Sequence, residues 1–318
     1  MKVSHKNPKV ADSFIKWVES RCGDPKLGQV KAKRGRVFDC LGMTLDFREK
    51  WKVKIDQSKG IKQMLKEFPE PIESEADTPA ASNLFQVNQS PALDKTRADV
   101  FHTFTAKALH FCKRGRPDIQ VAVAFLCTRV LQPTEEDWHK LMRMMRHLKG
   151  TQGVVLTLGT KVGAVMKWCA DAAFAVHPDM KSHSGFNMTW GLGSPISASR
   201  KQKLNTTSST TSELVAANEV MGPLMWTKLF LKAQGHGPTV LLMQDNTSAI
   251  KLERNGKASS GKSTRHLAIK FFHIKDLLDK KEFEVEHCPT EDMQADFLSK
   301  PLQGESFQKI FKWLMGIE

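Results

Sequence analysis

Val240-Leu241-Leu242-Met243-Gln244-Asp245 is the stretch that decides the fold class. Four consecutive apolar residues without alternation are typical of a strand that is covered on both faces, as in α/β sheets. Asp245 directly follows this strand, and ligands of α/β proteins bind beyond the carboxyl ends of strands. The sequence therefore predicts a mixed α/β sheet layered by helices, with Asp245 at a functional edge.

Three more acids occupy comparable positions in the expected elements. They are Asp171 after a strand at 164–170, Glu213 near the start of a helix at 211–233, and Asp296 in a helix at 291–300. Four converging carboxylates repel one another unless a cation neutralises them. Oxygen ligands without His or Cys suit Mg²⁺, and two such ions about 4 Å apart promote phosphodiester cleavage. We therefore expect Asp171, Glu213, Asp245 and Asp296 to bind two Mg²⁺ ions, with Mn²⁺ as a substitute.

Each acid also has a purely structural interpretation. Asp171 could begin a turn, and Glu213 lies three residues after Thr210, the spacing of a capping box. Asp245, together with Asn246, could cap the next helix. Asp296 could be an exposed acid on a short helix. The sequence leaves these alternatives open for each residue taken singly.

The chain carries a large positive charge. Its 318 residues include 48 Lys and Arg against 34 Asp and Glu, a formal net charge of +14. A surplus of this size favours binding to a polyanion, and nucleic-acid phosphate is the commonest one. Hydrophobic residues make up 40% and charged residues 26%, which is typical of a globular protein and not of a disordered chain.

Cysteine usage and hydropathy narrow the cellular location. The six cysteines form no Cys-x-x-Cys pair, which argues against a zinc knuckle or a disulfide framework and favours a reducing compartment. No apolar run approaches the ~20 residues that span a bilayer, and the first residues lack the apolar core of a signal peptide. We therefore predict a cytoplasmic or nuclear protein without a membrane partner.

Periodicity predicts helices and strands in a definite order. In the first half we expect a helix at 10–19, a hairpin with strands at 37–47 and 51–55, and helices at 61–68, 98–112, 118–130 and 135–149, the last capped by Thr134. Four prolines in residues 69–95 predict an exposed linker. In the second half we expect strands at 154–158, 164–170, 185–190, from 195, at 240–243 and at 283–287, with helices at 211–233 (interrupted or kinked at Gly222-Pro223), after Asp245, at 264–280 and at 291–300.

The sequence around the four acids forms ordered blocks across residues 160–302. These blocks are Asp171-Ala172, Ser208-Ser209-Thr210-x-x-Glu213, Gln244-Asp245-Asn246, Arg265-His266, and Pro289-Thr290-Glu291-Asp292 through Ala295-Asp296 to Lys300-Pro301-Leu302. In order and spacing they resemble the ribonuclease H domain of copia-type retrotransposon polyproteins. The resemblance implies a ribonuclease H-like mixed sheet flanked by helices, in which the four acids bind the metal ions.

Upstream blocks resemble the end of the same family's reverse transcriptase. Arg116-Pro117-Asp118-Ile119 and residues 133–151 are similar to its connecting region, and Cys40-Leu41-Gly42-Met43 resembles its primer-holding hairpin. The resemblance implies a smaller α+β thumb and connection region before the ribonuclease H-like part. The expected domains are a truncated palm end with hairpin and thumb at 1–68, a linker at 69–95, a helical connection at 96–152, the ribonuclease H-like domain at 153–302 and a C-terminal helix at 303–318. In the family the polymerase aspartates precede Lys2-Val3-Ser4-His5, so we expect no polymerase activity from this chain alone.

Several positions depart from the family pattern. The family usually has acids where Ala173 and Thr211 stand, often an Asp at Ala268, and Tyr at Phe271 and His287. None of these differences removes an expected metal ligand. They affect neighbours of the site and are compatible with a decaying element copy.

Other residues are weaker candidates for function. Arg200, Lys201, Lys203, Arg265 and His266 are expected to contact the nucleic-acid backbone. His273 and His287 are better explained as a solvated helix residue and a strand-end residue. Gly256-Lys257-Ala258-Ser259-Ser260-Gly261-Lys262-Ser263 matches a phosphate-loop spacing, but the motif should follow a buried strand and here follows helix-like residues.

The first hypothesis for function is a metal-dependent endonuclease that hydrolyses the RNA strand of RNA–DNA hybrids. Recognition of the hybrid would rest on backbone and 2′-hydroxyl contacts, with little base reading. The alternative is a catalytically silent, nucleic-acid-binding remnant of a retroelement. A transposase or integrase is disfavoured, because such enzymes normally use three acids and Asp296 supplies a fourth. The sequence does not fix the oligomeric state.

Overall fold

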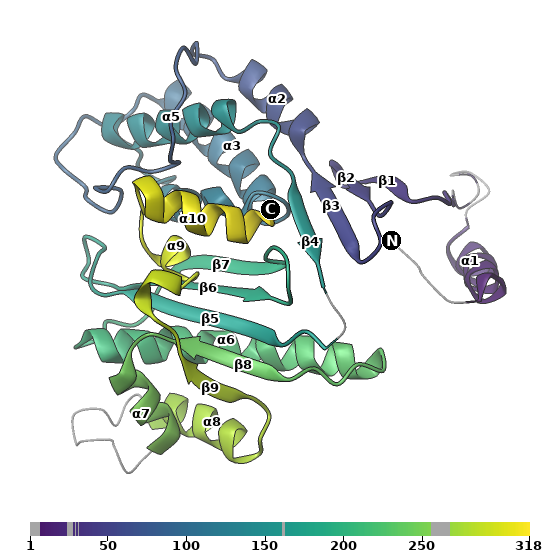
Figure 1. Cartoon of the computed structure of the whole chain (residues 1–318). Helices are drawn as coiled ribbons and strands as arrows, with labels where there is room; N and C mark the ends of the chain where they lie inside the picture. Colours follow the sequence, from purple (N-terminus) through teal and green to yellow (C-terminus); the bar gives the residue numbers. More distant parts are fainter. Residues whose placement is uncertain (1–6, 24–27, 29, 31, 161–162, 256–267) are drawn as a thin grey trace.

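The described part of the chain forms two β-sheets, with helices packed against them. The computed structural model describes residues 7–23, 28, 30, 32–160, 163–255 and 268–318. One sheet has the strand order β1-β2-β3-β4 and the other the order β7-β6-β5-β8-β9. Helices α2 to α5 gather on one side of the second sheet, and α6, α7 and α8 lie on the other (Figure 1). Every helix in the described ranges is too short or too polar to cross a lipid bilayer.

The first sheet begins after helix α1 (Pro8–Cys22). Its strands β1 (Val37–Cys40), β2 (Met43–Asp46) and β3 (Lys52–Asp56) pair antiparallel in succession. The single strand predicted at 37–47 is therefore wrong, because the chain reverses at Leu41-Gly42. Both turn residues have positive φ, 52° and 75°, the geometry of a two-residue hairpin loop.

Strand β4 (Leu156–Gly159) completes this first sheet by pairing antiparallel with β3. The prediction of a strand at 154–158 is confirmed, but its expected place in the ribonuclease H-like sheet is wrong. Leu156 packs instead with the last helix, α10 (Gly304–Met315), in a small separate core. The hairpin and the C-terminal helix thus meet on either side of β4.

Four helices form a compact layer around their own core. They are α2 (Ser58–Glu67), α3 (Lys95–Cys112), α4 (Gln120–Cys127, after a 3₁₀ turn at Pro117–Ile119) and α5 (Glu135–Gly150). The predicted N-cap of α5 is confirmed, since Thr134 and Asp137 form a complete capping box. Residues 69–95 are not the exposed linker that the prolines predicted, because Ala80, Leu84 and Phe85 are buried in this core.

A buried ionic network lies at the centre of the helical layer. Arg116 donates two hydrogen bonds to Asp118, at 2.8 and 2.6 Å, and two more to the carbonyl and hydroxyl oxygens of Thr151. His147 lies 3.0 Å from the same carboxylate through Nε2 and 3.2 Å from the Ala76 carbonyl through Nδ1. The Arg116, Asp118 and His147 side chains are at most 1% exposed. The network ties the 3₁₀ turn to α5 and to Ala76 in the proline-rich segment 69–95.

The second sheet is mixed, as the sequence predicts. Its strands are β5 (Met166–Ala173), β6 (His183–Thr189), β7 (Ile196–Lys201), β8 (Val240–Gln244) and β9 (Glu284–His287). The first three pair antiparallel, whereas β8 is parallel to β5 and β9 is parallel to β8. This order and direction of strands make a ribonuclease H-like sheet.

Helices cover both faces of the second sheet. Helix α6 (Ser209–Ala233) packs on one face, where Trp168, Leu214 and Leu242 are completely buried. It continues through Gly222-Pro223, so the predicted interruption is absent. Helices α7 (Thr247–Asn255) and α8 (Ala268–Asp279) extend the same layer (Figure 1). On the other side α4 meets β7, where Gln120 Nε2 donates to Ser197 Oγ at 2.7 Å.

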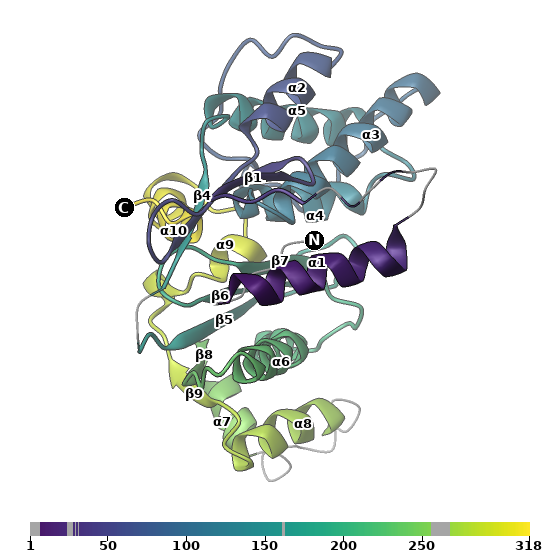
Figure 2. The same cartoon turned by 90° about the vertical axis from the view of Figure 1, so that its right-hand side faces the viewer.

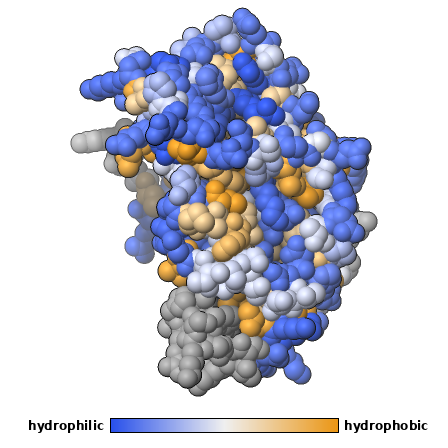
Figure 3. All heavy atoms as spheres, turned by 90° about the vertical axis from the view of Figure 1, so that its left-hand side faces the viewer, coloured by the Kyte–Doolittle hydropathy of each residue, from blue (hydrophilic) through white to orange (hydrophobic). Residues whose placement is uncertain are grey.

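The last part of the chain crosses the sheet edge where β5 and β8 end. The helix predicted at 291–300 is two pieces, a 3₁₀ turn at Thr290–Asp292 and helix α9 (Asp296–Ser299). Figure 2 shows α9 and α10 stacked between the second sheet and the helical layer. The face toward which β5 and β8 run is mostly hydrophilic, with apolar residues gathered in a central patch (Figure 3).

Candidate metal centre

Asp171 is held inside strand β5 and not at its end. The strand continues two residues further, to Ala173, and Asp171 pairs with Gly185 of β6. The sequence placed the strand end at residue 170, because small apolar residues after an acid carry little strand signal. Only 1% of Asp171 is exposed, so its carboxylate is withdrawn from water and faces the segments that pack over β5.

Asp245 arrives beside Asp171 through the parallel pairing of β8 with β5. The ladder pairs Cys169 with Met243, so the two acids follow at the same height, each two residues further along. Asn246 alone caps the next helix, because its side chain accepts from the amides of Ser248 and Ala249. The capping role considered for Asp245 is thereby filled by its neighbour. Thr290 Oγ1 donates to Asp245 Oδ2 at 3.3 Å.

Asp296 reaches the same point on helix α9. It is 9% exposed, so the interpretation as an exposed acid is wrong. One carboxylate oxygen from each of Asp171, Asp245 and Asp296 lies within 4.8 Å of the other two. The structure therefore brings together three of the four acids that the sequence singled out.

The close approach of α9 depends on Gly185, a residue that the sequence analysis did not connect with the site. A Cβ atom at Gly185 would lie 2.6 Å from the backbone of Ala295, Leu298 and Ser299. Real Cβ contacts of that length do not occur, so only glycine lets α9 rest directly on β6. A glycine inside a predicted strand is the available signal for such a contact.

Glu213 lies at the start of α6 and outside the group of three. The helix is capped by Ser208, whose hydroxyl accepts from the Thr211 amide, so the capping box with Thr210 does not form. Glu213 is 6% exposed, and its Oε2 has no hydrogen-bond partner among the described residues. Burial, reinforced by the charges of Asp171 and Asp245, raises the pKa of Glu213 to about 10.

Lys300 supplies positive charge to the cluster and was not predicted as a site residue. Its Nζ lies 2.8 Å from Asp296 Oδ1 and 3.2 Å from Asp171 Oδ2. Ser299 Oγ also donates to Asp171 Oδ2. Both contacts come from α9 and the residue after it, so the helix that brings Asp296 also brings the groups that satisfy Asp171. The spacing of four residues from Asp296 to Lys300 is the signal that could have identified the pair.

The pKa values of Asp296 and Asp245 indicate that repulsion between the carboxylates is only partly compensated. Burial, together with the charge of Asp171, raises the pKa of Asp296 to about 7, although Lys300 opposes the shift. Burial and the same neighbouring charge also raise the pKa of Asp245. One ammonium group therefore does not neutralise the cluster.

The donor set fits a divalent cation. Buried carboxylate oxygens, an unpartnered Glu213 Oε2 and raised carboxyl pKa values are the features that a bound Mg²⁺ or Mn²⁺ would relieve, because hard cations prefer oxygen ligands. Asp171, Asp245 and Asp296 could hold one ion between them.

The residues expected to contact nucleic acid differ in their exposure and in their partners. Arg200 is exposed on β7, with its guanidinium 5.2 Å from the centre of the Phe186 ring. Lys201 forms an ion pair with Asp179 at 2.8 Å, and Lys203 is exposed just after the strand. Arg265, His266 and the glycine-rich segment 256–263 lie outside the described residues. His287 is exposed at the end of β9 and His273 is exposed on α8.

The chain is similar in sequence to parts of transposon polyproteins. It is 27% identical over 292 residues to the retrovirus-related Pol polyprotein from transposon TNT 1-94 of Nicotiana tabacum, a match that covers 89% of this chain and 22% of that protein. It is 30% identical over 212 residues to the Pol polyprotein from transposon RE2 of Arabidopsis thaliana, covering 63% of this chain and 14% of that protein. The chain thus spans about a fifth or less of these relatives. No family model matches it.

Two solved structures illustrate its distant structural similarity. LC11-RNase H1, isolated from compost, is 17% identical with a TM-score of 0.34, covering 46% of this chain and 99% of that one. A foamy viral protease-reverse transcriptase in complex with dsDNA is 9% identical with a TM-score of 0.44, covering 83% of this chain and 46% of that one. The sequence matches extend over most of the chain, which is therefore similar to the retrovirus-related Pol polyproteins of copia-type transposons.

Proposed function

We propose that this chain is a metal-dependent endonuclease that hydrolyses the RNA strand of RNA–DNA hybrids. The observation that carries the proposal is the cluster of Asp171, Asp245 and Asp296, whose oxygens lie within 4.8 Å of one another on a ribonuclease H-like sheet. A structural ion pair would match each buried acid with a base. Here one lysine, Lys300, pairs with Asp171 and Asp296, and Asp245 forms no ion pair with any described residue, an arrangement that favours a site for cations.

The proposed division of ligands follows the resemblance to the ribonuclease H domain of copia-type polyproteins. Asp171 and Asp245 would bind both metal ions or either of them, Glu213 would bind one, and Asp296 the other. When bound, two divalent ions would supply an activated water and stabilise the leaving oxygen of the phosphodiester. The chain's own part is to fix the carboxylates: Gly185 admits α9, and Ser299 orients one oxygen of Asp171.

The substrate would lie along exposed basic residues beside the site. Arg200 and Lys203 present positive charge on and just after β7, and Lys201 shares its charge with Asp179. Arg265 and His266, which lie outside the described residues, stay expected contacts of the nucleic-acid backbone. Contacts of this kind bind phosphate and sugar, so cleavage would show little base preference.

Cleavage of a labelled RNA–DNA hybrid in Mg²⁺ tests the proposal. Wild type should cut the RNA strand, and Asp245→Asn should reduce cutting by at least about 100-fold, because even outer-shell partners of metal ligands cost 10- to 100-fold. Asp276→Asn is the matched control, since Asp276 is an exposed acid on α8 that pairs with Lys280.

Two outcomes would contradict the endonuclease. Equal cutting by wild type and Asp245→Asn would point to a contaminating nuclease. No cutting at high protein concentration, in Mg²⁺ or Mn²⁺, would favour the silent remnant, which binds hybrids in a salt-sensitive manner without cleaving them.

A further inference from the structure

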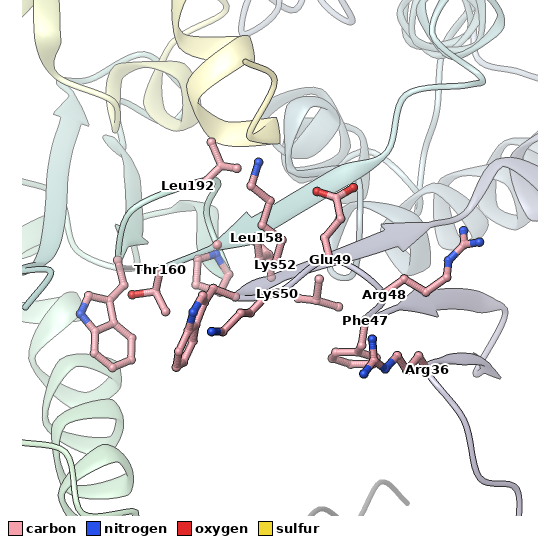
Figure 4. A pocket seen from close by; sticks show the side chains of 14 residues that line it. Arg36, Phe47, Arg48, Glu49, Lys50, Lys52, Leu158, Thr160 and Leu192 are labelled. Atoms are coloured by element: carbon pink, nitrogen blue, oxygen red, sulfur yellow. The ribbon is translucent and has the colours of Figure 1, made fainter. Parts of the chain in front are cut away.

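A groove of about 860 Å³ lies between the first sheet and one end of the second. Its walls come from the turn between β2 and β3, the end of β4 and the loop that follows β6. Figure 4 shows Arg36 and Phe47 toward one end, Thr160 toward the other and Lys50 between them. Segments distant in sequence thus build one continuous surface.

Trp51 is the unusual residue of this groove. Its φ is +65°, a conformation that costs any residue with a side chain and that glycine adopts freely. Its side chain is nevertheless large, apolar and 63% exposed. Neither folding nor solubility is served by an exposed tryptophan in a left-handed turn, and strain of this kind concentrates at binding sites.

Further aromatic side chains line the same groove. Phe47 lies at its edge, and Trp190 is half-buried and fixed by a 2.7 Å hydrogen bond from its Nε1 to the Ala164 carbonyl. His236, three residues after the end of α6, packs edge-to-face on Trp190 with ring centres 6.2 Å apart. The groove therefore offers planar faces that are held in place.

The charges around the groove are predominantly positive. Its lining contains four basic residues and one acid, Glu49. Arg48 pairs with Asp46, Lys52 pairs with Glu318, and Glu49 pairs with Lys54. No carboxylate within the described ranges forms an ion pair with Arg36 or Lys50, and Lys50 Nζ lies 5.7 Å from the centre of the Trp51 ring. The two cations without an acidic partner thus flank the exposed aromatic surface.

The groove is separate from the carboxylate cluster. Trp190 directly follows β6, whose Thr189 pairs with Lys167 near the start of β5, whereas Asp171 pairs with Gly185. Four residues along a strand correspond to about 13 Å, and the groove extends away from that point toward the hairpin. The site therefore requires its own explanation.

We propose that this groove binds unpaired nucleotides of a single-stranded nucleic acid, with a base stacked on Trp51 and a phosphate near Lys50 and Arg36. Exposed aromatic rings and cations together select a planar, anionic ligand. Bases in a duplex are already stacked on each other, so an exposed ring can take up only an unpaired base. The proposal goes beyond cleavage of hybrids and does not depend on it.

Binding of a fluorescently labelled strand of about 12 nucleotides, measured by anisotropy in EDTA, tests the groove. Both a DNA and an RNA strand are used, to separate recognition of base and phosphate from recognition of the 2′-hydroxyl. Trp51→Gly should raise Kd about tenfold or more, because the stacked ring is lost while the left-handed backbone is relieved. Trp51→Phe should restore part of the affinity.

Matched controls make the outcome decisive. Trp226 is 64% exposed on α6 and lies outside the groove, so Trp226→Ala should leave Kd unchanged. Lys50→Gln should lower the slope of log K against log salt by about 0.7, the value for one phosphate contact of a single strand. Lys281→Gln, at another exposed left-handed turn residue, should not.

Three results would overturn the proposal. They are unchanged binding by Trp51→Gly, an equal loss in Trp226→Ala, and no binding of either strand by wild type. Because EDTA removes divalent ions, none of these results depends on whether the carboxylate cluster cuts hybrids.

Discussion

Two groups of buried acids in this protein have opposite electrostatic states. Burial alone would raise the pKa of Asp118, but the charge and hydrogen bonds of Arg116, with His147, outweigh it and hold the pKa well below its usual range. In the Asp171 cluster burial and like charge prevail, and the pKa values of Asp245 and Asp296 rise. In the first group the carboxylate is neutralised by its own protein partners and the network is complete. The second group is incomplete, because it needs added positive charge. A buried acid thus indicates function by the partners it lacks.

Removing the base from the complete network should have the largest effect. Arg116→Ala leaves the Asp118 carboxylate buried without its partner, and we expect a loss of about 3–5 kcal/mol in the free energy of unfolding. Urea denaturation followed by circular dichroism measures this loss. Arg97→Ala, at a partly exposed pair with Glu135, should cost at most about 1 kcal/mol. Similar losses of stability in Arg116→Ala and Arg97→Ala would show that the buried Arg116 network contributes no more than a partly exposed ion pair.

The buried pair His177 and His183 provides a test by pH of the difference between buried groups that have an oppositely charged partner and those that lack one. His147 lies beside a carboxylate, but His177 Nε2 lies 2.9 Å from the imidazole of His183. Burial, aided by the nearby charge of Lys201 and opposed by Asp179, lowers the pKa of His177 from 6.5 to about 4. The unfolded chain therefore binds this proton first, so stability is complete above about pH 6.5 and is lost as pH falls toward 4.

The size of that loss can be measured directly. The shift corresponds to at most about 3 kcal/mol. Urea unfolding at pH 7 and pH 5 should show a smaller difference for His177→Gln, whose amide stays neutral, than for wild type. An identical pH dependence in both proteins would exclude His177 as the source.

Divalent cations should stabilise only the incomplete cluster. At a Mg²⁺ concentration 100 times Kd, the free energy of unfolding should rise by about 2.7 kcal/mol. Asp171→Asn should abolish most of this increase, while Asp276→Asn should retain it. Chemical denaturation with Mg²⁺ or EDTA measures the difference, and an equal Mg²⁺ response in both variants would contradict the metal site.

The same substitution, Asp to Asn, should change the free energy of unfolding in opposite directions at Asp296 and at Asp118. In EDTA at pH 8, Asp296→Asn removes a like charge from the cluster, and we expect a gain of about 1 kcal/mol in stability. Asp118→Asn removes the partner of Arg116 and should destabilise. Parallel denaturation of the two variants checks the signs, and destabilisation by both would mean that Lys300 already balances the cluster.

The sequence predicted the second sheet well, because its signals are local. The uninterrupted apolar run of β8 and the acid that follows it mark a central strand and its functional end. Three of the four chosen acids come within 4.8 Å of one another because parallel pairing aligns Asp171 with Asp245. The distances and shifted pKa values support the chosen residues, and their role as metal ligands stays a prediction.

The features that the sequence analysis missed depend on non-local contacts. Nothing in residues 156–159 tells whether they pair with β3 or with the second sheet, since alternation fits either partner. The proline-rich segment looks exposed until Phe85 is seen packed against His177, 4.9 Å between ring centres. Gly185 carries no side chain, so its importance is visible only when α9 lies on it.

Because α9 packs on Gly185, the carboxylate cluster can form only late in the synthesis of the chain. Ser299 donates to Asp171 across 128 positions of sequence, so strands β5 and β8 leave the ribosome well before the segment that brings Asp296, Ser299 and Lys300. Until then Asp171 and Asp245 lack both their lysine and their third acid. A nascent chain can therefore complete the central strands of its sheet before it can assemble the carboxylate cluster.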